Sequence, residues 1–268
     1  MGLFIEEIMR QFAVIFSVLF LLTACVSSET TITKNNPSSG GKTKFDPEAA
    51  AQIRVKLAVA HLEKDNMAKA KENLEIALEY EPDNADIYRV FGYYYQRVNE
   101  NEEAEAQYKK SLSLDKKNAR TYSVYGAFLC KQERYEEAET AFLKAIDVSN
   151  FTGVANIYEN AATCSEKSGN LDKALSYYQS ALSHNPKKTY LHLNLAKVLI
   201  DKKEYKNARA NLFKFQKSSG VTAESLWQWI RVSYATGNSA SLNKYATALL
   251  TDFPESEQAL HYLNHDHE

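Results

Sequence analysis

The sequence predicts an all-α fold, a right-handed superhelical solenoid of about six stacked helix pairs closed by a C-terminal capping helix. Two observations predict it. Small, apolar and proline landmarks recur at a spacing of about 34 residues, the length of one helix pair. Only 9 glycines and 5 prolines stand against 17 tyrosines and 12 phenylalanines, which favours continuous helices packed through aromatic side chains. Such a stack folds as one cooperative domain.

The first unit, residues 51–84, sets the register of the repeat. Counted from Ala51, its landmarks stand at positions seven, eight, twenty, twenty-seven and thirty-two: Leu57, Ala58, Ala70, Ala77 and Pro82. This pattern is typical of the tetratricopeptide repeat. Its small residues let two antiparallel helices approach closely, and its proline ends the second helix.

Five further units follow, and Gly153 and Val154 read as an insertion in the register. The units are residues 85–118, 119–152, 155–188, 189–222 and 223–256. Asp46 and Pro47 read as the N-cap and first turn of the first helix, and residues 257–264 read as the capping helix. A single repeat domain is therefore expected over residues 47–268.

The N-terminus reads as a signal peptide over residues 1–24. Its apolar core, residues 12–22, is about 11 residues long, too short to span a bilayer. The core ends in Leu22-Thr23-Ala24-Cys25, which resembles a bacterial lipobox. The resemblance implies a diacylglycerol on Cys25 and, with Val26 following, an outer-membrane anchor facing the periplasm. The alternative is that Cys25 is only a small apolar residue that ends the signal core.

Residues 25–46 are rich in Ser, Thr, Asn, Gly and Lys. Such a segment cannot bury enough apolar surface to fold, so we expect a flexible tether. Its root-mean-square reach is on the order of 25 Å. The repeats would then stand off the membrane that holds the lipid.

Charge and motifs exclude several classes of function. The formal net charge is −2, so no excess of basic residues is present to bind nucleic acid. We recognise no phosphate-binding loop, nucleophile elbow, zinc motif or paired carboxylates, so we expect no enzyme, small-molecule substrate, metal or cofactor other than the lipid. His261 and His265 are spaced like a metal pair, but with His267 they read as a polar tail.

Cys130 and Cys164 are 34 residues apart, on the first helices of neighbouring units. A periplasmic location makes a disulfide chemically feasible, and we expect one. The alternative is a pair of buried free cysteines, because the inserted residues leave the geometry open.

The concave surface of the solenoid, lined by first helices, is the expected binding surface. Positions five, nine and twelve of the first repeat are Val55, Val59 and Leu62. Those of the second repeat are Arg89, Tyr93 and Gln96. We expect these six residues to form a partner-binding groove whose apolar part, the first-repeat trough, accepts a helix or an extended segment. The alternative is that the chain before Gln52 covers the trough.

The order of lipobox, polar tether and six repeats resembles the PilF/PilW family of type IV pilus biogenesis and stability proteins. That resemblance covers the whole chain. It implies a pilotin, a lipidated protein that binds the secretin subunit, brings it to the outer membrane and assists its multimerisation. Cys25 would be the anchor and the first-repeat trough would hold the secretin. The alternative function is a periplasmic lipoprotein scaffold for peptidoglycan hydrolases or for an outer-membrane protein assembly machine.

Overall fold

The computed structural model describes residues 45–148 and 153–264. The predicted signal peptide, Cys25 and almost all of the predicted tether lie outside these residues, as do His265 and His267. The described residues form thirteen helices and contain no strand. No helix among them is long and apolar enough to cross a membrane.

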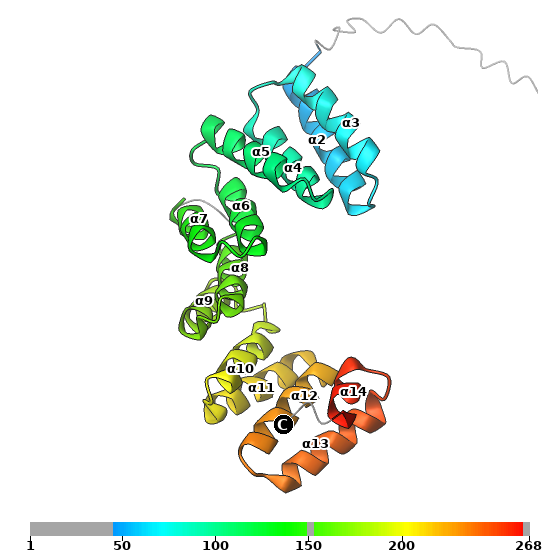
Figure 1. Cartoon of the computed structure of the whole chain (residues 1–268), viewed down its shortest axis with the longest axis vertical. Helices are drawn as coiled ribbons and strands as arrows, with labels where there is room; N and C mark the ends of the chain where they lie inside the picture. Colours follow the sequence, from blue (N-terminus) through cyan, green and yellow to red (C-terminus); the bar gives the residue numbers. More distant parts are fainter. Residues whose placement is uncertain (1–44, 149–152, 265–268) are drawn as a thin grey trace, which may run out of the picture. The chain divides into compact units, whose positions relative to one another are not determined.

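The helices form six consecutive antiparallel pairs, which confirms the predicted fold class (Figure 1). The first three pairs are α2 (Pro47–Glu63) with α3 (Met67–Tyr80), α4 (Ala85–Arg97) with α5 (Asn101–Leu114), and α6 (Ala119–Lys131) with α7 (Tyr135–Asp147). The next three are α8 (Val154–Lys167) with α9 (Leu171–His184), α10 (Leu191–Asp201) with α11 (Tyr205–Ser219), and α12 (Ala223–Ala235) with α13 (Ser239–Asp252). The short helix α14 (Glu257–Leu263) follows them.

Side-chain caps begin most of these helices where the sequence places short polar residues. The Asp46 carboxylate accepts a hydrogen bond from the Ala49 amide at 3.1 Å, with Pro47 in the first turn, as predicted. Asn118 and Asn170 cap α6 and α9 in the same way. Each cap satisfies an amide that the helix itself leaves unbonded.

Within every pair the turn contains a left-handed residue at position fifteen of the repeat. Only Gly169 and Gly237 are glycines. The other four are Asp65, Asn99, Glu133 and Lys203, with φ between 60° and 62°. Because a side chain disfavours this conformation, the helix packing on either side determines the turn at these four positions.

The two helices of a pair approach closely because position eight is small where position twenty-four is large. A Cβ on Gly92 would lie 2.6 Å from the Tyr108 ring, and one on Gly126 would lie 2.8 Å from the Phe142 ring. In the sixth pair the sizes are reversed, since Ile230 shares a core cluster with Ala246. In the sixth pair the large residue is therefore on the first helix instead of the second, and the core remains packed.

Candidate protein-binding surface

The structure corrects the prediction that Val55, Val59 and Leu62 form an accessible first-repeat trough. Leu62 is 0% exposed and lies in the core cluster that joins the first two repeats, so its side chain offers no surface to a partner. Val55 and Val59 are half-buried against the same cluster. The reason is that Leu62 lies near the end of α2, where α4 packs over it and Arg97 donates a hydrogen bond to the Leu62 carbonyl at 3.3 Å.

The predicted groove residues of the second repeat are engaged within the fold to different degrees. Arg89 pairs with Asp86 at 2.9 Å, and the Gln96 amide oxygen accepts a hydrogen bond from the Tyr108 hydroxyl at 3.1 Å. Tyr93 is 38% exposed, and its hydroxyl accepts a hydrogen bond from Arg97 that raises the pKa of the arginine. Tyr93 is therefore the most open of these three side chains.

A different surface emerges from positions three, seven and ten of each first helix. In repeats two to six these positions face the preceding pair and are buried or half-buried. They are Ile87, Phe91 and Tyr94; Thr121, Tyr125 and Phe128; Ile157, Ala161 and Cys164; Leu191, Leu195 and Val198; and Ser225, Trp229 and Val232. The core clusters show the packing, since the residues of the second repeat cluster with those of the first and those of the fifth with those of the fourth.

In the first repeat the same three positions are exposed. Ile53 is 57% exposed, Leu57 is 42% exposed, and Ala60 is also exposed. These residues follow one another at spacings of four and three, so they form one stripe on α2, here called the free end face. It is apolar like the junction faces, but no described helix packs on it. The sequence contains the signal for this exposed stripe. The first repeat has apolar residues at its junction positions, although the segment that precedes it is polar.

The junctions between repeats are also joined by covalent and charged contacts. Cys130 and Cys164 form a disulfide in the structure, with Cα atoms 5.8 Å apart, and Cys164 is at junction position ten. Glu105 accepts hydrogen bonds from Arg134 at 2.7 Å and from the Tyr125 hydroxyl at 2.8 Å. The Arg134 guanidinium lowers the pKa of Glu105 to about 2. These contacts link the second repeat to the third, and the disulfide links the third to the fourth.

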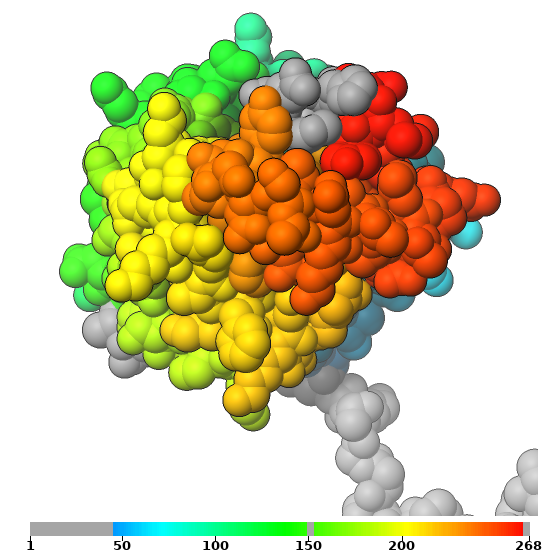
Figure 2. Space-filling view, turned by 90° about the horizontal axis from the view of Figure 1, so that it is seen from below, coloured from blue at the N-terminus to red at the C-terminus, as the bar shows by residue number. Residues whose placement is uncertain are grey.

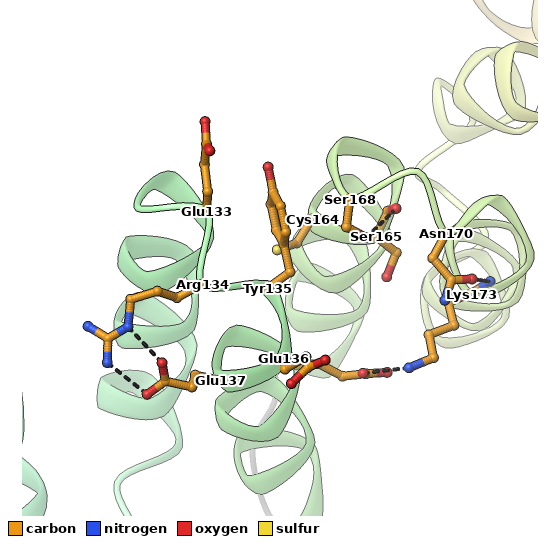
Figure 3. Close-up of a pocket in the computed structure, with 11 residues that line it drawn as sticks. Glu133, Arg134, Tyr135, Glu136, Glu137, Cys164, Ser165, Ser168, Asn170 and Lys173 are labelled. Carbon is orange, nitrogen blue, oxygen red and sulfur yellow. Dashed lines mark hydrogen bonds and ion pairs between the residues drawn. The ribbon is translucent and has the colours of Figure 1, made fainter.

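A polar cavity of about 520 Å³ lies beside the disulfide, between the third and fourth repeats. Figure 3 shows the bonded pair Arg134 and Glu137 on one side of the cavity. Lys173 lies on the other side. Lys173 pairs with Glu139 at 2.6 Å. Because these charges satisfy one another, the cavity reads as a solvated crevice of the junction. No group of three or more potential metal ligands occurs among the described residues.

Comparison with known proteins agrees with this architecture. Models of the tetratricopeptide-repeat family match residues 51–84, 85–118, 118–187 and 167–213, more than half of the chain. The type IV pilus assembly protein PilF of Pseudomonas aeruginosa is 29% identical over 244 residues, which cover 91% of this chain and 94% of PilF.

Two solved structures are similar over most of their lengths. That of Pseudomonas aeruginosa PilF has a TM-score of 0.70 and 27% identity, covering 82% of this chain and 99% of its own. That of PilW, a widely conserved type IV pilus biogenesis factor, has a TM-score of 0.71 and 25% identity, covering 80% of this chain and 98% of its own. The chain belongs to the tetratricopeptide-repeat family and is a homologue of the type IV pilus proteins PilF and PilW.

Proposed function

We propose that the chain is an outer-membrane lipoprotein of type IV pilus biogenesis that binds the secretin subunit and promotes its localisation and multimerisation. The observation that carries the proposal is the free end face. Ile53 and Leu57 are apolar and exposed at positions that every later repeat covers with a preceding helix pair. A partner helix with an apolar face can pack there as that missing pair would.

The free end face replaces the first-repeat trough as the proposed contact. Its apolar side chains lie outside the core, so a partner can bury them without disturbing the repeat. Burial of a large aliphatic side chain contributes about 1.5–3 kcal/mol, so two of them can dominate a small interface. Tyr93, at 38% exposure, offers a further contact on the concave side.

Lipid on Cys25 would hold this end of the array near the outer membrane. The predicted tether ends at residue 46, just before Pro47 begins α2, and the free end face belongs to that helix. A secretin segment bound there would stay within reach of the bilayer, on the order of 25 Å. Raised local concentration would then favour assembly of secretin subunits.

Two test variants and one control separate the binding surface from the fold. Ile53→Glu with Leu57→Glu should weaken capture of the secretin subunit about 100-fold while the far-ultraviolet circular dichroism stays unchanged. Leu143→Glu is the matched control, because Leu143 is 49% exposed on α7, far from the free end face in sequence, and it should bind normally. Val59→Glu with Tyr93→Glu tests the concave side. Loss of binding only in that variant would assign the contact to the concave surface instead.

A third variant tests the membrane role. Cys25→Ala should remove the lipid, leave secretin binding in solution intact, and reduce secretin multimers in the outer membrane. Normal multimers in that variant would disprove the pilotin mechanism. Cross-linking that recovered peptidoglycan hydrolases or an outer-membrane assembly machine, with no secretin, would favour the scaffold function.

A further inference from the structure

The second helix of the fifth repeat, α11, differs in charge from the other second helices. It contains Lys206, Arg209, Lys214 and Lys217 and no acidic residue. The second helices of the first three repeats, α3, α5 and α7, contain ten acidic and five basic residues, a net charge of −5. Those of the last three contain six basic and two acidic residues, a net of +4, all of it from α11.

The four cations lie around one exposed aromatic side chain. Phe213 is 65% exposed, the largest exposed fraction among the large apolar residues described. Lys206, Phe213 and Lys217 are spaced by seven and four residues, so they share one face of the helix. Arg209 and Lys214 flank that face, and all four cations are exposed. We call these five residues the α11 outer face.

Contacts within the fold do not account for this arrangement. The nearby Lys202, by contrast, is paired, since it contacts both Asp172 and Glu204. None of the four α11 cations forms an ion pair with another described residue. Phe213 points away from the buried side of α11, which Ala208, Leu212 and Phe215 form. Figure 2 shows the yellow to gold surface of α10 and α11 open to solvent.

We propose that the α11 outer face docks on an anionic phospholipid bilayer. Cations attract phosphate headgroups, and an exposed aromatic ring among them can enter the boundary between headgroups and acyl chains. The face spans eleven residue steps, about 16 Å along a helix, and its charged side chains surround the ring on both sides. A flat bilayer can meet all five side chains together.

An acidic polypeptide is the competing occupant of a basic surface. In this repeat family peptides enter the concave side, which first helices line. The α11 outer face is on a second helix and projects a single exposed aromatic ring among its cations. A lone projecting ring favours insertion into a fluid surface over enclosure of a peptide. The proposal is independent of secretin binding, because it uses a different face of a different repeat.

Vesicle binding tests the proposal with residues 45–268, which contain every described helix and all five core clusters. The fragment should sediment with vesicles of phosphatidylethanolamine and phosphatidylglycerol, less strongly at high salt, and not with phosphatidylcholine. Lys206→Gln with Lys217→Gln should weaken binding about twentyfold, and Phe213→Ser about tenfold. Lys69→Gln with Lys71→Gln on α3 should have no effect. Leu143→Ser, at the same repeat position as Phe213, should likewise have none.

Insertion of the ring has its own readout. Phe213→Trp should add fluorescence that shifts to the blue and is quenched by brominated lipid in anionic vesicles, relative to the parent with Trp227 and Trp229. Leu143→Trp should not respond. Equal binding to both kinds of vesicle, or unchanged binding by Phe213→Ser, would overturn the proposal. So would vesicle-independent capture of polyglutamate through the same residues, or a concentration-dependent dimer that Phe213→Ser abolishes.

Discussion

Repeats one and two place apolar residues at the same three junction positions, with opposite results. Ile53 is 57% exposed, whereas Ile87, at the equivalent position, is 0% exposed. The difference is the neighbour, since α4 packs on the first pair while no described helix packs on the corresponding face of α2. The exposure of a residue in a repeat array is therefore set by its place in the stack as well as by its own repeat.

The strongest test of this comparison places the same charge at both positions. Ile87→Glu should lower the free energy of unfolding by about 4 kcal/mol or more, because an unpaired carboxylate enters the junction core. Ile53→Glu should change it by less than about 0.5 kcal/mol, because the side chain stays in water. Urea unfolding followed by circular dichroism measures both. A large loss for Ile53→Glu would mean that the free end face is covered within the chain itself.

A second test concerns the packing inside a pair, which the free end does not affect. Gly126→Ala should cost about 1–2 kcal/mol of unfolding free energy, because the new methyl group overlaps the Phe142 ring and the better helix propensity of alanine offsets only part of that. Adding Phe142→Leu should recover at least half of the loss. The double variant recreates the alanine–leucine pairs of the first and fifth repeats. Thermal unfolding of both single variants and the double variant checks this.

Coupling between the two substitutions is the decisive quantity. If the costs of Gly126→Ala and Phe142→Leu simply add, the glycine is not needed for the ring, and the close approach of α6 and α7 has another cause. The same cycle at Gly92 and Tyr108 provides a repeat of the experiment in the neighbouring pair.

Much of the fold could be predicted from the sequence because its determinants are local and recur. The spacing of Ala58, Ala70 and Ala77 identifies two antiparallel helices, and Asp46 with Pro47 marks where the first one begins. The same spacing recurs in the later units and predicts their helix pairs, since each unit packs on the one before it. The two-residue insertion, assigned to Gly153 and Val154, is also readable, because the left-handed turn residues Glu133 and Gly169 are 36 residues apart where the other neighbouring turns are 34 apart.

The binding surface was harder to predict because burial depends on neighbours. Leu62 was expected in a groove from its position in the repeat, but α4 and Arg97 enclose the end of α2. Ile53 and Leu57 occupy junction positions, which normally belong to the core, so their own repeat does not mark them as exposed. The basic face of α11 was likewise hidden by a net charge near zero, since acidic helices elsewhere balance it.

The smallest expected effect concerns the ion pair of Glu105 with Arg134, which joins the second repeat to the third. The free end face has no such contact among the described residues. The pKa of Glu105 is lowered to about 2 from an ordinary value of 4.5, chiefly by Arg134. The unfolded chain therefore binds the proton more tightly, and the stabilisation by Glu105 is lost as pH falls from about 4.5 to about 2. Solvent partly screens the group, so Glu105→Gln should cost about 1 kcal/mol at neutral pH and have little effect near the acid limit. Urea midpoints measured across this range check it, with Glu133→Gln as an exposed control. Parallel pH curves for Glu105→Gln and the unsubstituted chain would show that this carboxylate does not stabilise the junction.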